Sequence, residues 1–313
     1  MIVSASRRTD IPALYEPWFF HRLSEGFVWV RNPFNPHQVS RIPLSPDEVD
    51  AFVFWTKNAA PMLAQLDALR PYPFYFQFTL TSYGPDVEPG LPSKRTVILP
   101  AFLRLSRLIG PERVIWRYDP ILFSSRYTPD FHARSFAALA KALQGSTYRC
   151  VFSFFKPYRK AERNVQPLRL LSMDEETMRN LVRSMAQTAH AYGMQLEACA
   201  QPMDLTAYGV GRAHCIDAQL LERLCGMPLK TKKDTGQRPL CGCAASVDIG
   251  AYNTCINGCL YCYANANPQT VMTRFHAHDS ASPLLCSTLS PYDTIAETKA
   301  ASVRVSQTRL KPD

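Results

Sequence analysis

One segment of the sequence decides the fold: Val114-Ile115-Trp116-Arg117-Tyr118-Asp119-Pro120, a short apolar run that ends in charged residues. Short runs rich in apolar, β-branched and aromatic residues are typical of buried strands. The same pattern recurs in five other segments: Ile2–Ser6, Ala51–Trp55, Phe74–Leu80, Cys150–Phe155 and Met194–Cys199. Amphipathic stretches between them, such as Thr128–Gln144 and Asp174–Tyr192, are expected to be helices. Strand–helix alternation predicts an α/β protein with a mostly parallel sheet, either open or curled into a barrel.

Polar side chains follow the first five of these runs, at the points where the strands are expected to end. They are Thr9 and Asp10, Thr56 and Lys57, Thr79 and Thr81, Arg117 and Asp119, and Lys156. In parallel α/β folds the carboxyl ends of the strands meet at one edge, where ligands bind. We therefore expect one polar pocket. For Lys57, Arg117 and Asp119, an internal ion pair at the mouth of a barrel is the alternative role.

The remaining segments have weaker patterns. Val30–Asp47 and Tyr83–Lys94 are rich in proline, glycine and serine, and we expect long loops that cover the site. Asn58 is expected to cap a helix that extends to about Arg70, and Asp293–Ser302 is expected to form a short helix. Ser246–Tyr252 has the composition of a strand.

Composition places the chain among ordinary globular proteins. Of its 313 residues 46% are hydrophobic and 19% are charged, which argues against intrinsic disorder. No apolar run approaches the roughly 20 residues that span a bilayer, and no secretory leader is visible, so we expect a cytoplasmic protein without a membrane partner. The net charge of +9 permits binding to nucleic acid but is also typical of a solvated basic surface.

Ten cysteines are present, and seven of them lie from Cys199 to Cys259. Cytosolic thiols stay reduced, so a dense cluster there indicates metal binding rather than disulfides. Cys255, Cys259 and Cys262 have the spacing Cys-x3-Cys-x2-Cys, in which three thiolates can hold three irons of a [4Fe–4S] cluster and leave the fourth iron open. A zinc ribbon is the alternative, although it usually has two Cys-x2-Cys pairs.

A second set consists of Cys199, Cys215, Cys241 and Cys243. Four thiolates could hold an auxiliary [4Fe–4S] cluster or a structural zinc ion. The alternative is that Cys199 and Cys215 are buried small hydrophobic residues, as free cysteines often are.

The segment Cys255-Ile-Asn-Gly-Cys259-Leu-Tyr261-Cys262 resembles the signature of the radical S-adenosylmethionine (SAM) superfamily, Cys-x3-Cys-x-aromatic-Cys. The resemblance implies that the three cysteines hold a [4Fe–4S] cluster whose open iron binds SAM, with Tyr261 near the adenine. It also implies reductive cleavage of SAM to a 5′-deoxyadenosyl radical that abstracts hydrogen from a substrate. An electron donor such as flavodoxin or ferredoxin would be a partner.

The superfamily normally carries this motif near the N-terminus, whereas here it lies near the C-terminus. The polar strand ends resemble, in the same order, those of the spore photoproduct lyase branch: Ser6–Pro12, Thr56–Asn58, Phe78–Thr81 and Arg117–Ile121. This likeness implies a partial parallel (β/α) barrel that is circularly permuted. Residues 1–200 would supply barrel strands and helices, 201–245 a cysteine-containing insert or auxiliary metal site, and 246–313 the cluster-binding strand, its loop and a C-terminal helix.

Nearly the whole chain also resembles an uncharacterised bacterial family, the domain of unknown function numbered 1848. The combined prediction is a radical SAM enzyme in which Lys57, Arg117 and Asp119 act on SAM or substrate. Thr9, Asp10, Thr56, Thr79 and Tyr261 would contact the cofactor. The alternative is a non-catalytic iron–sulfur or zinc protein that binds nucleic acid through its basic surface. The sequence leaves the substrate open, and a nucleic acid is one candidate.

Overall fold

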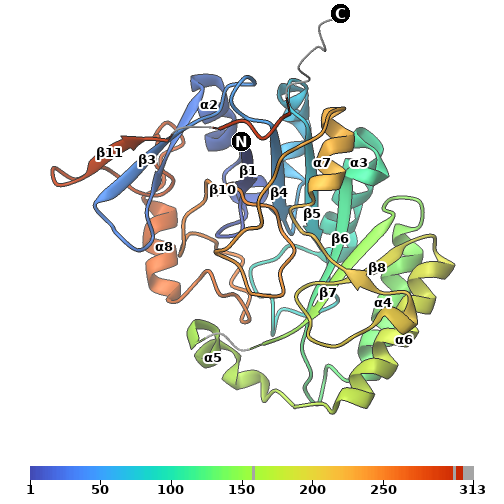
Figure 1. Cartoon of the computed structure of the whole chain (residues 1–313). Coiled ribbons are helices and arrows are strands. Elements are labelled where there is room, and N and C mark those ends of the chain that lie inside the picture. Colours follow the sequence, from blue (N-terminus) through green and yellow to red (C-terminus); the bar gives the residue numbers. More distant parts are fainter. Residues whose placement is uncertain (157–158, 299–300, 306–313) are drawn as a thin grey trace, which may run out of the picture.

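The computed structural model describes residues 1–156, 159–298 and 301–305, and its centre is a parallel sheet of eight strands (Figure 1). The strand order is β10-β1-β4-β5-β6-β7-β8-β9, and each neighbouring pair is parallel. The strands are β1 (Ile2–Ala5), β4 (Ala51–Thr56), β5 (Phe74–Thr79), β6 (Val114–Ile121), β7 (Arg149–Phe154), β8 (Gln195–Ala198), β9 (Gly211–Arg212) and β10 (Val247–Asp248). The expected α/β class and parallel sheet are confirmed, in a form compatible with a partial barrel.

The two faces of the sheet carry different side chains because neighbouring residues of a strand point to opposite faces. Phe54, Phe76 and Trp116 belong to a large aromatic core on the outer face. Val53 and Tyr75 belong to a second core on the inner face, where smaller and polar side chains predominate. Since both faces are buried, the strands have the continuous apolar runs seen in the sequence.

Most of the helices pack on the outer face, whereas the helix over 218–225 packs on the inner core through Leu220 and Leu221. Most of the helix bounds agree with the sequence pattern. The α-helices are α1 (Ile11–Leu14), α2 (Glu16–Glu25), α3 (Leu99–Ile109), α4 (Pro129–Leu143), α5 (Arg159–Val165), α6 (Glu175–Ala191), α7 (Ala218–Cys225) and α8 (Pro268–His276). The predicted helices over 128–144 and 174–192 are α4 and α6. Each begins after a side chain that caps its first turn, Thr128 on the amide of Phe131 and Asp174 on that of Thr177.

Two expectations outside the main sheet are wrong. Val30–Asp47 contains most of a hairpin, β2 (Phe27–Arg31) and β3 (Gln38–Pro43), rather than a long loop. In the segment expected to be helical, 293–302, residues Thr294–Glu297 form β11, which pairs in parallel with β3; residues 299–300 lie outside the described part. The free edge of β3 explains this, because an extended segment can satisfy its own backbone there by adding a strand.

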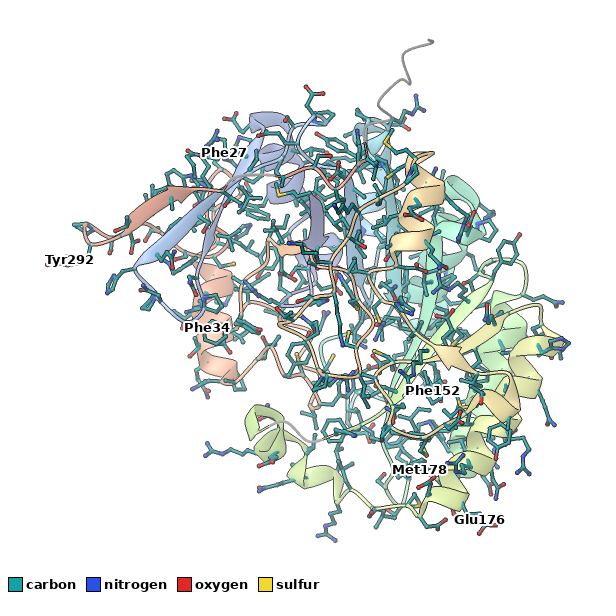
Figure 2. The ribbon with its side chains drawn as sticks, in the orientation of Figure 1. Phe27, Phe34, Phe152, Glu176, Met178 and Tyr292 are labelled. Carbon is teal, nitrogen blue, oxygen red and sulfur yellow. The ribbon has the colours of Figure 1, made fainter. Side chains whose placement is uncertain are left out.

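This small sheet projects from the main body (Figure 1). Phe34 and Tyr292 lie at its outer end with 95% and 79% of their surfaces exposed, whereas Phe152 is fully buried (Figure 2). The helix expected after Asn58 is present as the 3-10 helix η1 (Pro61–Leu69), whose C-cap is Arg70. The expected cap is absent, because Asn58 Oδ1 accepts from the Ala60 amide and no side chain caps the first residue of η1. The other short helical turns are η2 (Lys94–Ile98), η3 (Pro111–Arg113), η4 (Gln166–Leu168) and η5 (Thr206–Tyr208).

Strand β10 brings the C-terminal region beside the N-terminal strand. Val247 and Asp248 pair with Val3 and Ser4 of β1 at the edge of the sheet. The carboxylate of Asp248 accepts hydrogen bonds from Ser4 Oγ at 3.1 Å and Ser6 Oγ at 2.6 Å. It also accepts from two backbone amides, those of residues 7 and 250, at 2.8 and 3.0 Å. One side chain therefore connects β1, β10 and the turns that follow both strands.

In the part of the chain that the structure describes, no helix combines the length and the apolar character that crossing a membrane requires.

Replacing Asp248 tests how strongly this pairing holds the fold. We expect Asp248→Ala to lower the free energy of unfolding by about 2–4 kcal/mol, because it leaves four donors without their acceptor in a partly buried place. Chemical denaturation measures this change. The matched control is Asp47→Ala, an exposed carboxylate in a turn, for which we expect a change within about 0.5 kcal/mol. Equal effects of the two substitutions would contradict the assigned role of Asp248.

Candidate functional site

The three cysteines of the Cys-x3-Cys-x2-Cys motif lie in the loop between β10 and α8, which we call the cysteine loop (residues 251–267). Because β10 is parallel to the other strands, this loop leaves the sheet at the carboxyl ends of the strands. Tyr15 of the α1–α2 corner donates a hydrogen bond to the carbonyl of Thr254 at the start of the motif. Gly258, between the first and second cysteines, adopts φ +64°, a left-handed conformation that favours glycine.

The three thiols lie close enough to influence one another; Cys259 is buried, and Cys255 and Cys262 are half-buried. Burial raises the pKa of Cys255, and the neighbouring Cys259 and Cys262 raise it further. Burial raises the pKa of Cys259 to about 12. Thiolates held this way need a positive charge to offset them, and a metal centre supplies it.

The three thiols of the motif suit a cluster better than a single metal ion. Among the described residues no three His, Cys, Asp or Glu side chains surround a point where one ion could bind. A cubane cluster makes a different demand, because each thiolate binds its own iron and the sulfurs stand farther apart than the ligands of one ion. Three thiols in one loop, without a fourth, fit such a cluster with one open iron.

Segment 83–94 packs against the cysteine loop and forms backbone hydrogen bonds with it. The Gly90 amide donates to the carbonyl of Asn257, and the Leu260 amide donates to the carbonyl of Val87, both at 3.0 Å. A Cβ on Gly90 would lie 2.4 Å from the carbonyl oxygen of Ile256, so the close approach requires glycine. The proline- and glycine-rich composition of 83–94 therefore serves a specific contact with the loop that it covers.

Glu88 is the centre of a buried ionic network against the cysteine loop. Lys57 Nζ donates to Oε1 of Glu88 at 2.8 Å, and Lys94 Nζ pairs with Oε2. The Tyr261 hydroxyl also donates to Glu88, and Thr81 Oγ1 lies 3.1 Å from each carboxylate oxygen. Lys57 Nζ lies 2.7 Å from the Tyr261 hydroxyl. The strand-end lysine and the aromatic residue of the motif are therefore held by one carboxylate.

Glu88 and Lys57 are both charged in this network. Burial raises the pKa of the Glu88 carboxyl, but Lys57 and Lys94 outweigh burial and lower it to about 2. Burial lowers the pKa of Lys57, but Glu88 and then Cys259 outweigh it, so the pKa lies above its ordinary value. Lys57 is thus a fixed cation beside the Cys259 thiol.

Glu88 and Lys94 were missed from the sequence because they lie in a segment interpreted as a covering loop. A charged pair in a proline-rich loop has no periodic pattern that marks it as buried. The available signal was Lys57, a strand-end cation that would need an acidic partner once buried.

Asp10 and Thr56 join the ends of β1 and β4 to the cysteine loop. Thr56 Oγ1 donates to Asp10 at 2.7 Å, and the Lys57 amide and Asn257 Nδ2 donate at 2.8 and 3.3 Å. Burial raises the pKa of Asp10 to about 6, although these donors oppose it. The carboxylate is thus occupied by protein donors. Thr9 Oγ1 is buried without a hydrogen-bond partner. Cofactor contact by Thr9, Asp10 and Thr56 stays a prediction.

Arg117 Nη2 lies 2.5 Å from Asp119 Oδ2, so these residues form the internal ion pair that was their alternative role. Ser153 Oγ also donates a hydrogen bond to Asp119. Thr79 is paired with Arg117 in the β5–β6 register. Arg117 Nη1 lies 2.9 Å from Cys215 Sγ, so its guanidinium faces the second set of cysteines. Action of these residues on SAM or substrate stays a prediction.

A cavity of about 150 Å³ lies where β6 and β7 end. It is lined by Pro120, Ser153, Phe154, Phe155, Lys156, Arg238, Tyr261, Cys262 and Tyr263. Cys262 and Tyr261 come from the cysteine loop, and Ser153 is the donor to Asp119. One wall of this cavity therefore comes from the cysteine motif. Of the polar strand-end residues expected to form one pocket, Lys156 lines the cavity and the others do not, so a single polar pocket stays a prediction.

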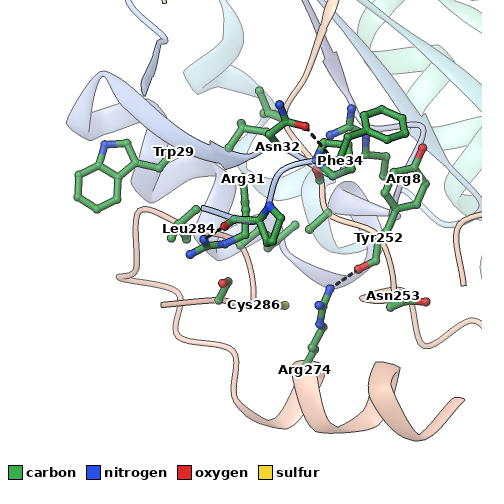
Figure 3. A pocket seen from close by; sticks show the side chains of 18 residues that line it. Arg8, Trp29, Arg31, Asn32, Phe34, Tyr252, Asn253, Arg274, Leu284 and Cys286 are labelled. Atoms are coloured by element: carbon green, nitrogen blue, oxygen red, sulfur yellow. Dashed lines mark hydrogen bonds between the residues drawn. The ribbon is translucent and has the colours of Figure 1, made fainter. Parts of the chain in front are cut away.

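A second cavity, of about 340 Å³, lies behind the segment that leads into the cysteine loop (Figure 3). Arg274 of α8 donates to the carbonyl of Tyr252 at 2.7 Å across it, and the Arg8 guanidinium lies over the Tyr252 ring. Cys286 is the cysteine in its lining. We assign no chemistry to this cavity. The contacts that Arg274 and Arg8 make with Tyr252 hold the start of the cysteine loop in place.

The chain belongs to the family described as a domain of unknown function, DUF1848, whose model matches residues 2–264. The matched span contains the Cys-x3-Cys-x2-Cys motif, the second set of cysteines and all the polar strand ends discussed above. Comparison with curated proteins gives no significant match. The full-length family resemblance noted in the sequence is thereby confirmed.

The ionic network gives a stability test with a definite pH dependence. We expect Glu88→Gln to lower the free energy of unfolding at pH 7 by about 3–5 kcal/mol, because two buried ammonium groups lose their carboxylate. The folded pKa of Glu88, about 2, lies below the unfolded value. The stabilisation is therefore complete above about pH 5 and is lost as the pH falls, so the difference between variant and wild type narrows toward pH 2.

Urea denaturation at several pH values measures both effects. The matched control is Glu112→Gln, which breaks the exposed pair with Arg223 and is expected to cost no more than about 1 kcal/mol. A Glu88→Gln difference that stayed constant from pH 7 to pH 3 would show that the carboxylate is not charged in the folded protein.

Proposed function

We propose that this chain is a radical SAM enzyme whose [4Fe–4S] cluster is held by Cys255, Cys259 and Cys262. The observation that carries the proposal is the placement of these three buried or half-buried thiols, without a fourth ligand, in the loop that follows edge strand β10. The cavity beside Cys262 supports it, because a catalytic cluster needs an open position next to a space for the reacting molecule.

The order of the strands supports a circular permutation. From β1 onward the main sheet follows chain order, β1-β4-β5-β6-β7-β8-β9, and only β10 is out of sequence. If β10 were placed at the start of the chain, all eight strands would follow one another as in a simple (β/α) repeat. The cysteine loop would then follow the first strand, as the radical SAM resemblance implies. Asp248 is the side chain that joins the two halves of this permuted arrangement.

When bound, the cluster would supply one electron that splits SAM into methionine and a 5′-deoxyadenosyl radical, which takes a hydrogen atom from the substrate. The three cysteines would hold it through thiolates and leave the fourth iron to the amino and carboxylate groups of SAM. The chain's own residues bind and orient. Lys57 offsets negative charge at Cys259, Glu88 fixes Lys57 and Tyr261 together, and segment 83–94 restrains the loop.

Tyr261 links the metal motif to the cavity. Its hydroxyl is held by Glu88 and Lys57, and its ring lines the cavity beside Cys262. A ring fixed at one end presents a rigid apolar face, suited to an adenine. Cys262 and Tyr261 form one wall of the cavity, and Ser153 and Lys156 come from the strand-end side.

The test is reductive cleavage of SAM by protein prepared without oxygen. We expect the reconstituted wild type to convert SAM to 5′-deoxyadenosine and methionine when a strong reductant is added, measured by chromatography and mass spectrometry. Cys259→Ala is expected to lower the yield of 5′-deoxyadenosine at least about a hundredfold, because one iron loses its ligand. Cys150→Ala, which removes a buried thiol of the outer core, is the matched control and should retain activity.

Two results would contradict the proposal. One is a wild type that carries zinc rather than iron at the motif. The other is a Cys259→Ala variant as active as Cys150→Ala. Salt-sensitive affinity for DNA or RNA without any binding of SAM would instead favour the non-catalytic alternative.

A further inference from the structure

The second set of cysteines converges on the inner face of the sheet. Cys199 follows β8, Cys215 follows β9, and Cys241 and Cys243 belong to the segment that returns across this face before β10. All four are buried within the inner core, between 2% and 7% exposed. The nearest pair, Cys199 and Cys215, has its sulfurs 3.6 Å apart. Four thiols distant in sequence therefore share one buried place.

The four sulfurs form a chain rather than a closed tetrahedron. Cys215 lies within hydrogen-bonding reach of Cys199 and of Cys243, and Cys243 within reach of Cys241. Among the residues with described positions, no three such ligands surround the place of a single ion. Sulfurs 3.6 Å apart have the spacing of two thiolates on one metal atom, since ligands about 2.3 Å from a tetrahedral centre stand about 3.8 Å apart. The successive pairs therefore fit a cluster in which each iron takes two thiolates, rather than a cubane with one thiolate on each iron.

Three guanidinium groups surround these thiols. Arg117 Nη1 lies 2.9 Å from Cys215 Sγ, and Arg238 Nη2 lies 3.5 Å from Cys199 Sγ. Arg7 interacts electrostatically with Cys243, and one of its terminal nitrogens is buried without a hydrogen-bond partner. Neutral buried thiols would not require three cations, whereas thiolates on a cluster carry net negative charge that these cations would offset.

The arginines are themselves fixed in position. Arg7 and Arg117 stack on Trp55, with guanidinium carbons 5.3 and 5.2 Å from the centre of the ring. Arg117 is paired with Asp119, and Arg7 with Asp234 at 3.0 Å. Because both carboxylates are shared with other donors or partly exposed, the positive charge facing the sulfurs is not cancelled at its source.

Hydrogen bonds to and from the backbone also fix the positions of Cys215 and Cys243. Tyr75 Oη and Gln77 Nε2 donate to the Cys215 carbonyl at 2.7 and 2.8 Å, and the Ile216 amide lies 3.4 Å from Cys243 Sγ. A Cβ on Gly242 would lie 2.5 Å from the His214 ring, so the Cys-x-Cys pair requires glycine at its centre. Amide–sulfur hydrogen bonds of this kind tune the potential of iron–sulfur clusters.

Loading of the site has an entry path. Cys241, Gly242 and Cys243 line an open cavity of about 780 Å³ on the side away from the cysteine loop. On the other side, Arg238 lines the 150 Å³ cavity together with Cys262. The second set therefore lies between a surface opening and the cavity of the proposed active site.

We propose that Cys199, Cys215, Cys241 and Cys243 hold a second metal centre, an iron–sulfur cluster ligated by four thiolates. Assembly from ferric iron and sulfide releases the four thiol protons to solvent, changes no oxidation state and leaves no open iron, so this centre is distinct in kind from the proposed SAM-binding one. The inference stands on its own residues and does not require that the first centre cleave SAM.

The test is metal content in two complementary variants, each reconstituted with ferrous and ferric iron and sulfide without oxygen. The triple variant Cys255→Ala/Cys259→Ala/Cys262→Ala removes the first centre and is expected to retain about two to four irons with matching sulfide per chain. The double variant Cys199→Ala/Cys215→Ala is expected to lose that same amount relative to wild type. Cys150→Ala is the matched control, a buried cysteine away from both sets, and should retain the full wild-type content.

The outcomes separate the two proposals. A triple variant with as much iron as wild type contradicts the first centre and supports the second. A triple variant with neither iron nor sulfide, or with zinc in their place, overturns the second centre. If the triple variant does not fold, as judged by circular dichroism, the double variant decides: iron and sulfide contents equal to those of Cys150→Ala overturn the inference, and a loss of about two to four irons supports it.

Discussion

Parallel pairing of β10 with β1 is the interaction on which the rest of the site depends. Two residues of β10 are in register with Val3 and Ser4, and Asp248 adds four hydrogen bonds from the turns beyond. Because the pairing is parallel, the chain must leave β10 at the same edge where β1, β4, β5 and β6 end. The cysteine loop is thereby delivered to the strand ends from a position late in the sequence.

Charge compensation around buried sulfur is the second constraint. Cys259 has Lys57 beside it, and Lys57 is held by the fully buried carboxylate of Glu88. The second set has Arg117 and Arg238 in contact with its sulfurs. Burying such cations is costly unless they are paired, so each is tied to a carboxylate, a sulfur or an aromatic ring. Both sets of cysteines thus have cations beside them that would offset the charge of metal-bound thiolates.

Much of the architecture could be predicted from local patterns. Apolar runs such as Ala51–Trp55 and Phe74–Leu80 were located within one or two residues, and the caps Thr128 and Asp174 marked two helices, because these signals depend on neighbouring residues alone. The β2–β3 hairpin and β11 were missed, since an edge strand is decided by a distant partner. The proline content of 30–47 also suggested a loop.

The candidate site shows the same division. The motif spacing marked Cys255, Cys259 and Cys262, and the strand ends marked Lys57 and Arg117, but nothing local assigns Lys57 to Glu88 and Arg117 to Cys215. Those partners lie 31 and 98 residues away along the chain. The four cysteines of the second set were grouped by residue type alone, and the structure adds the arginines that surround them.

The central claim is that the cysteine loop leaves one iron open to SAM. Electron–nuclear double resonance of the reduced protein, with SAM labelled with nitrogen-15 in its amino group, tests this contact directly. The account predicts a nitrogen-15 coupling to the cluster signal that disappears in Cys259→Ala. A cluster signal that shows no nitrogen-15 coupling, at SAM concentrations where binding is saturated, would contradict it.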